Sequence, residues 1–119
     1  MKEFIICSAI YINDGEKHTD QPTNITTGFV ISGRRHNNCY ATIKSLKGVN
    51  WEEYLNLVDH TDEQQGFITS LNKYLNREDA FIMAKENNQL LFPKLYGKNQ
   101  KNILTSECIF PTNWEDFSY

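Results

Sequence analysis

The chain has 119 residues, of which 39% are hydrophobic, 13% aromatic and 23% charged, with a formal net charge of −3. This length fits one compact domain over residues 1–119, and the composition excludes disordered and membrane-embedded chains. The net charge disfavours a sequence-independent DNA or RNA binder, because such domains are usually strongly basic. No apolar run approaches the roughly 18 residues that a membrane span needs.

The cysteines indicate a reducing compartment. Cys7, Cys39 and Cys108 are odd in number and widely spaced, and no CxxC pair occurs. They fit neither a disulfide framework nor a zinc motif, so we expect structural thiols in a cytosolic protein. The three histidines lack metalloprotease spacing, and we expect no metal centre.

The first half of the chain predicts two strands and two helices. Phe4–Ile12 is β-branched and aromatic, and Ile25–Ser32 is expected to pair with it as an antiparallel hairpin. The polar segment Asn13–Asn24 between them predicts an exposed loop. The next segment predicts an asparagine-capped helix that ends at Lys47-Gly48, and an apolar stripe predicts a further helix over 50–58.

The second half predicts a hairpin, a helix and a last strand. Gly66–Ser70 indicates a third strand, and a turn leads into the short strand Tyr74-Leu75. Asn76 is a good N-cap for a helix that weakens at Asn87-Asn88. Ile103–Phe110 predicts a final strand. The fold class is therefore α+β, with a small antiparallel sheet packed against two or three helices.

Two clusters of cations are candidate anion ligands. Gly33-Arg34-Arg35-His36 places potentially cationic side chains where a strand passes into a helix start, and helix N-termini attract anions. Arg77 is a cation in the first turn of the next predicted helix, where acids are expected. A guanidinium matches phosphate oxygens two at a time. The alternative is that these arginines pair with some of the 15 acidic residues on the surface.

Phe67 is the aromatic residue that best fits stacking on a nucleobase, because Gly66 precedes it and two small hydroxyl side chains follow. Core burial is the commoner role of an aromatic ring. Asn87 offers an amide that can read a base edge, although an asparagine at a helix end is usually a terminator. The candidate ligand-binding residues are Arg34, Arg35, His36, Phe67, Thr69, Ser70, Arg77 and Asn87.

Catalytic patterns are weak in this sequence. His36 and Cys39 lie three residues apart, but no orienting third group or family signature accompanies them. There is no GxSxG, Walker or GxGxxG motif. We therefore expect a protein that is not an enzyme and that needs no cofactor.

Four ordered blocks resemble a family of small phage-encoded proteins. The blocks are IICSAI, GRRHNNCYATI, QGFITSLNKYLNREDAFIMAKENNQL and LTSECIF. Their layout is similar to the first described type of Thoeris anti-defence protein, a sponge that sequesters immune signalling nucleotides. The resemblance omits the loop 13–24 and the tail after Phe110. The loop and Cys108, where an acid is expected, depart from the pattern and leave the ligand and the oligomer contacts open.

The resemblance implies an α+β protomer that dimerises and can assemble further into hexamers. It implies that cyclic ADP-ribose isomers bind at the protomer interface without cleavage, and some members also bind cyclic di- or trinucleotides at separate sites. The matching positions are Arg34, Arg35, Phe67 and Arg77. We therefore expect a homo-oligomeric sponge in the host bacterial cytoplasm. The alternatives are a small enzyme that degrades such signals and a protein-binding inhibitor of a host defence protein.

Overall fold

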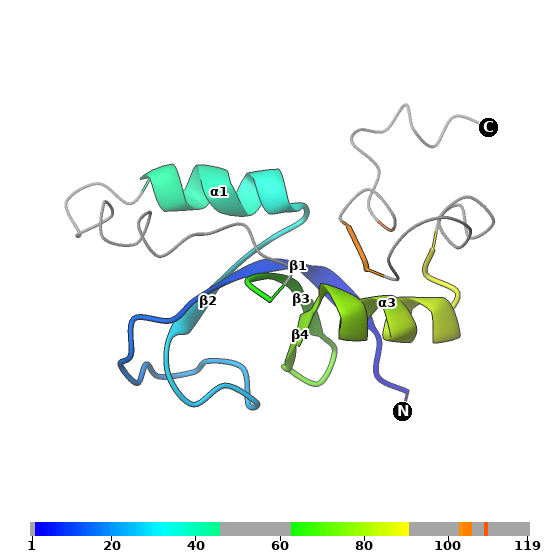
Figure 1. The fold of residues 1–119 in the computed structure, drawn as a ribbon, viewed down its shortest axis with the longest axis horizontal. Helices are drawn as coiled ribbons and strands as arrows, with labels where there is room; N and C mark the ends of the chain where they lie inside the picture. The colour runs from blue at the N-terminus through cyan, green and yellow to red at the C-terminus, as the bar shows by residue number, and fades with distance from the viewer. Residues whose placement is uncertain (1, 46–62, 91–102, 106–108, 110–119) are drawn as a thin grey trace.

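A four-stranded sheet with two helices forms the part of the chain that the structure describes, residues 2–45, 63–90, 103–105 and 109 of a computed structural model (Figure 1). The elements run in the order β1 (Ile5–Ile12), β2 (Phe29–Gly33), α1 (His36–Ser45), β3 (Gln65–Thr69), β4 (Tyr74–Asn76) and α3 (Arg77–Glu86). All strand pairs are antiparallel, and the strand order is β2-β1-β3-β4. The predicted α+β class is confirmed.

Both helices cover the same face of the sheet. Ser8 pairs with Phe67 on one side and with Gly33 on the other, and Ile10 pairs with Ile31. Directly opposed residues share a face, so these side chains point the same way. On this face α1 packs over β1 and β2, whereas α3 packs over β3 and β4 (Figure 1).

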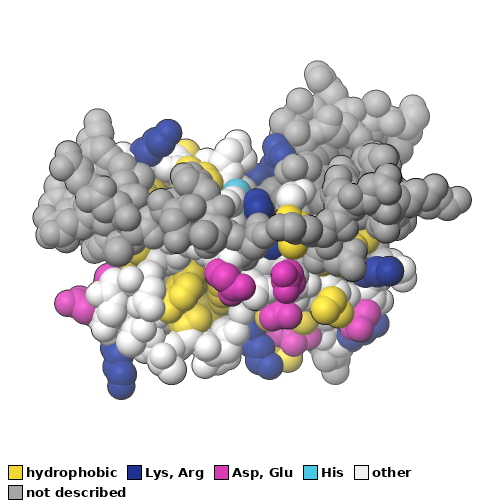
Figure 2. Space-filling view, in the orientation of Figure 1, with side chains coloured by type: hydrophobic (Ala, Val, Ile, Leu, Met, Phe, Trp, Pro, Cys, Tyr) yellow, Lys and Arg dark blue, Asp and Glu magenta, His cyan; other side chains and the backbone are white. Residues whose placement is uncertain are grey.

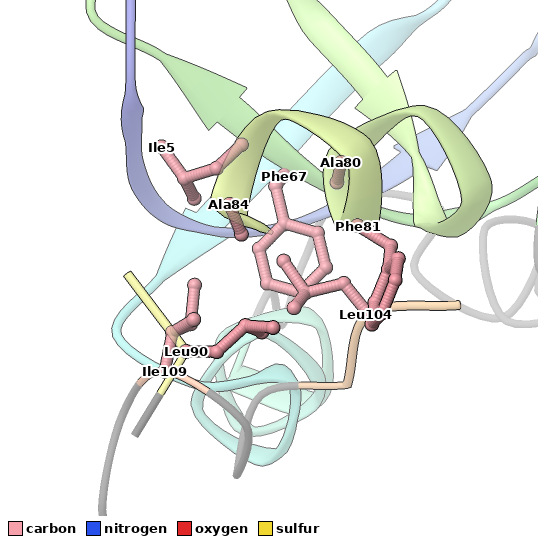
Figure 3. Packing of buried hydrophobic residues seen from close by; sticks show 8 residues of the cluster. All are labelled: Ile5, Phe67, Ala80, Phe81, Ala84, Leu90, Leu104 and Ile109. Carbon is pink, nitrogen blue, oxygen red and sulfur yellow. The ribbon is translucent and has the colours of Figure 1, made fainter. Parts of the chain in front are cut away.

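Each helix buries its own apolar cluster. Figure 3 shows the cluster beneath α3, in which the Phe67 ring lies among small and branched side chains. Its members are Ile5, Phe67, Ala80, Phe81, Ala84, Leu90, Leu104 and Ile109. The cluster beneath α1 is made of Ile10, Ile12, Ile31, Cys39 and Ile43. β1 contributes to both clusters, with Ile5 in the one beneath α3 and Ile10 and Ile12 in the one beneath α1.

The predicted β3–β4 turn and the predicted ends of α3 are confirmed. Asn76 caps α3, because its side chain accepts a hydrogen bond of 2.9 Å from Asp79 N. Asn72 takes a positive φ of 57° in the β3–β4 turn, a conformation that asparagine tolerates. Asn87 is the C-cap, so α3 ends where the asparagine pair predicts.

Two predicted strands differ in the structure. The second strand begins at Phe29 and not at Ile25, because Gly28 has a φ of +84° and donates its N–H to Glu16 O instead of to a strand partner. Residues 103–105 are not in a strand, and Ile109 is helical. Leu104 N instead donates to Arg77 O at 2.9 Å, which fixes this segment against the start of α3.

Several predictions concern residues outside the described ranges. These are the helix end at Lys47-Gly48, the helix over 50–58, Cys108 and the tail after Phe110. Within the described ranges, no helix has the length and apolar character needed to cross a membrane.

Candidate functional site

The backbone at the start of α1 is fixed by a reciprocal turn. Arg35 N donates to Asn38 Oδ1 at 3.0 Å, and Arg35 O accepts from Asn38 N at 3.0 Å. Ser8 Oγ donates to Arg34 O at 3.1 Å, which ties the same turn to β1. Within this turn the Arg34 side chain is exposed and Arg35 is half-buried.

His36 is the buried member of the basic block, with 7% of its surface exposed. Its Nε2 lies 2.9 Å from Gly66 O, and since a carbonyl oxygen only accepts, Nε2 must hold a proton. The imidazole also meets the Phe67 ring edge-on, with centroids 5.1 Å apart. These contacts make His36 a link between the start of α1 and the middle of β3.

Arg77 links the start of α3 to β3, as His36 links the start of α1 to β3. Its Nη2 donates to Gln65 Oε1 at 3.0 Å, and Gln65 is 8% exposed in β3. The neighbouring phenol of Tyr74 is buried, which raises its pKa, and the positive charge of Arg77 opposes that shift. The Arg77 guanidinium is therefore held at the sheet by a buried side chain.

The structure brings the two clusters of cations, Gly33–His36 and Arg77, to consecutive residues of β3. His36 contacts Gly66, and Arg77 contacts Gln65. Gly66 also pairs directly with Asn76, the N-cap of α3. The two helix starts therefore meet at one place, which we call the Gln65 end of β3. Figure 2 shows basic side chains and a histidine close together near the middle of this view of the molecule.

Phe67 does not fit the stacking role that the sequence suggested. The side chain is fully buried, with 0% exposed, and is surrounded by the cluster beneath α3 (Figure 3). Because the ring has no exposed surface in the protomer, it cannot stack on a nucleobase in this conformation. The glycine before Phe67 serves the sheet instead, because a Cβ at Gly66 would lie 2.2 Å from Leu75 O.

The remaining three candidates lie at the other end of β3, which we call the Thr69 end. Thr69 is 1% exposed, and its hydroxyl donates to Glu3 Oε2 while accepting from the backbone N–H of the β3–β4 turn. Ser70 Oγ accepts from Phe4 N at 3.0 Å. Asn87 Nδ2 donates to Glu3 O at 2.9 Å. All three side chains fasten the N-terminal segment.

The two ends of β3 are separate places. Thr69 lies four positions after Gln65, which corresponds to about 13 Å of extended strand. The candidates therefore separate into Arg34, Arg35, His36 and Arg77 at one end and the hydroxyl and amide residues at the other.

The described thiols have the environment of structural cysteines. Burial raises the pKa of Cys39 to about 12, and it also raises the pKa of Cys7. His36 Nε2 is bonded to Gly66 O at 2.9 Å, and Cys39 Sγ donates to Arg35 O at 3.5 Å. This geometry does not form an activated Cys–His pair.

Two features were missed from the sequence. The first is Gln65 of the QGF block, since nothing in the sequence around Gln65 indicates its hydrogen bond with Arg77. Asp14, Glu16 and His18 place their ligand atoms within 4.8 Å of one another in the β1–β2 loop. The spacing of these residues at i, i+2 and i+4 is the sequence pattern that could have indicated this cluster.

Comparison with known proteins gives one match. A family model described as phage T4 y16D protein matches residues 4–110 of the chain. No curated protein and no solved structure matches.

Proposed function

This chain belongs to the phage T4 y16D protein family, and we propose that it is an anti-defence sponge, which binds a nucleotide immune signal and sequesters it without cleaving it. The observation that best supports the proposal is the meeting of two arginine-bearing helix starts on Gln65 and Gly66. The ligand class is a cyclic nucleotide with a pyrophosphate, such as a cyclic ADP-ribose isomer.

The chemistry of the Gln65 end suits a pyrophosphate. Two helices of ten residues begin there, and each N-terminus offers N–H donors and a positive dipole end. The exposed Arg34 and the half-buried Arg35 and Arg77 add guanidinium donors. His36 acts as a positioning residue, because its Nε2 is bonded to the sheet.

Acidic neighbours restrict where such a ligand can lie. Glu78 and Asp79 follow Arg77 in the first turn of α3, and both are exposed. Their charge repels an anion, whereas the bond to Gln65 directs the guanidinium toward the sheet. The proposed ligand therefore lies on the α1 side of Arg77.

Sequestration is favoured over cleavage by the state of the described thiols. Cys39 is fully buried with a raised pKa, which suppresses nucleophilic chemistry. The proposed sponge acts in the host bacterial cytoplasm as a homo-oligomer. Light scattering that gave only monomers at micromolar concentration would remove the oligomer from the proposal.

Calorimetric titration with cyclic ADP-ribose isomers tests the ligand site. Replacing Arg77 with Ala should weaken binding by roughly 1.5–3 kcal/mol, or about tenfold to 150-fold, the scale of a hydrogen bond to a charged group. Lys85→Ala is the matched control, since it removes an exposed cation from the last turn of the same helix. Equal affinities of Arg77→Ala and the parent contradict the site.

Recovery of the bound ligand separates the proposed function from its alternatives. A sponge that is heated after incubation releases the intact nucleotide, whereas an enzyme releases products. A protein-binding inhibitor binds neither cyclic ADP-ribose isomers nor cyclic oligonucleotides, and it forms a stable complex with a host polypeptide. Release of products contradicts the sponge function, and so does failure to bind these nucleotides together with a stable complex with a host polypeptide.

A further inference from the structure

The loop between β1 and β2 gathers three metal-ligating side chains that the proposed nucleotide site does not use. His18 Nε2 lies 2.8 Å from Asp14 Oδ2, and a Glu16 carboxylate oxygen lies within 4.8 Å of both ligand atoms. Asp14 is half-buried, while Glu16 and His18 are exposed. Two carboxylates and one imidazole thus face a common space at the surface.

The three side chains are held by the fold of the loop. Asp14 Oδ1 accepts from Glu16 N at 3.0 Å, which leaves Oδ2 directed at His18. Glu16 O accepts from Gly28 N at 2.7 Å, so the middle of the loop is fixed to the start of β2. The His18 ring packs edge-on against Phe29, with centroids 5.1 Å apart.

We infer that Asp14, Glu16 and His18 form a binding site for a divalent transition-metal cation of the Zn²⁺ class. One imidazole nitrogen and two carboxylate oxygens are donors that Zn²⁺ accepts at about 2.0–2.2 Å. Ligand atoms around such an ion lie roughly 3 Å apart, close to the present His18–Asp14 separation. The proton that His18 Nε2 shares with Asp14 moves to Nδ1 or to solvent, so that Nε2 can bind the metal. Rotation of the exposed Glu16 side chain brings in the third ligand, and water completes the coordination.

Charge also favours a cation at this place. With a neutral imidazole, the two carboxylates leave a net charge of −2 within the cluster. A divalent cation neutralises both carboxylates, whereas the hydrogen bond from His18 satisfies only one of them. The site differs from a purely acidic surface cluster because it contains a nitrogen ligand that hard cations do not require.

Titration of the untagged full-length chain with zinc chloride tests this site. We expect one Zn²⁺ per chain, and we expect affinity to fall at least about tenfold in His18→Gln and in Glu16→Gln, since loss of a direct ligand should cost no less than loss of a supporting contact. Glu86→Gln is the matched control, because it removes an exposed acid from α3. Amide NMR shifts on zinc addition should be confined to the β1–β2 loop and the start of β2.

Other outcomes overturn the inference. Absence of zinc binding in the parent does so, and so does equal affinity in the loop variants. A half-buried thiol is a competing ligand, so Cys7→Ser is titrated alongside. Zinc binding that is lost in Cys7→Ser and retained in His18→Gln places the metal on sulfur and not in the loop.

Discussion

Both ends of β3 carry polar side chains, but these side chains hold different segments of the chain. At the Thr69 end, hydroxyl and amide groups bond to the N-terminal segment and to the β3–β4 turn. At the Gln65 end, a buried histidine and a buried glutamine hold the starts of two helices, and arginines accompany both helix starts. The comparison shows that side chains of types common in ligand sites, such as His36, Thr69 and Asn87, can instead hold segments of the fold together.

Phe67, between the two ends, should give the largest effect. Phe67→Ala removes a fully buried ring beneath α3 and leaves a cavity, so we expect a loss of about 3–5 kcal/mol in the free energy of unfolding. Urea denaturation measures it. Ile82→Ala in α3 is the control, because the Ile82 side chain is 56% exposed and its loss should change the free energy of unfolding by less than about 0.5 kcal/mol. A small effect of Phe67→Ala would restore the stacking role.

Thr69→Val sharpens the comparison at the structural end. The change keeps the shape but removes the hydroxyl that bonds to Glu3 and to the turn, so we expect a loss of about 1–3 kcal/mol in stability. Affinity for the nucleotide should match that of the parent. A Thr69→Val protein of normal stability and reduced affinity would return this end of β3 to the ligand site.

Alkaline pH should weaken the region beneath α1. The pKa of Cys39 is raised by burial from the ordinary thiol value of 9.0 to about 12. Between pH 9 and pH 12 the thiol keeps its proton in the folded state but releases it in the unfolded state. The free energy of unfolding therefore falls as the pH rises above 9, by up to about 1.4 kcal/mol per pH unit. Tyr74 shifts in the same direction. Urea midpoints from pH 8 to 11 should fall less steeply in Cys39→Ala than in the parent.

Arg34→Ala should have the smallest effect on folding. The Arg34 side chain is exposed, and its carbonyl oxygen, which the substitution keeps, makes the bond to Ser8. We expect a change in stability of less than about 0.5 kcal/mol together with weaker nucleotide binding. Arg77→Ala should instead lose about 1 kcal/mol of stability, since its guanidinium bonds to Gln65. Thermal unfolding and calorimetry on both variants separate the two roles, and a clear loss of stability in Arg34→Ala would contradict the assignment.

The local elements could be predicted where short-range signals agree. The β-branched run gives β1, the turn at Asn72 gives the β3–β4 hairpin, and Asn76 gives the start of α3. Prediction failed at Ile25–Gly28, where apolar and β-branched residues suggest a strand. There the left-handed backbone of Gly28 and its bond to Glu16 O, a contact made across the loop, end the strand early.

The sequence by itself determined the class of the fold and the cations at the two helix starts, because caps, turns and periodicity act over a few residues. Only the tertiary structure decided what each candidate does. Phe67 and Thr69 became core and turn residues since the α3 cluster and Glu3 lie next to them, and both neighbours come from distant positions in the chain. The contacts of His36 with Gly66 and of Arg77 with Gln65 span 30 and 12 residues, and only the pairing of β1, β3 and β4 brings these groups together.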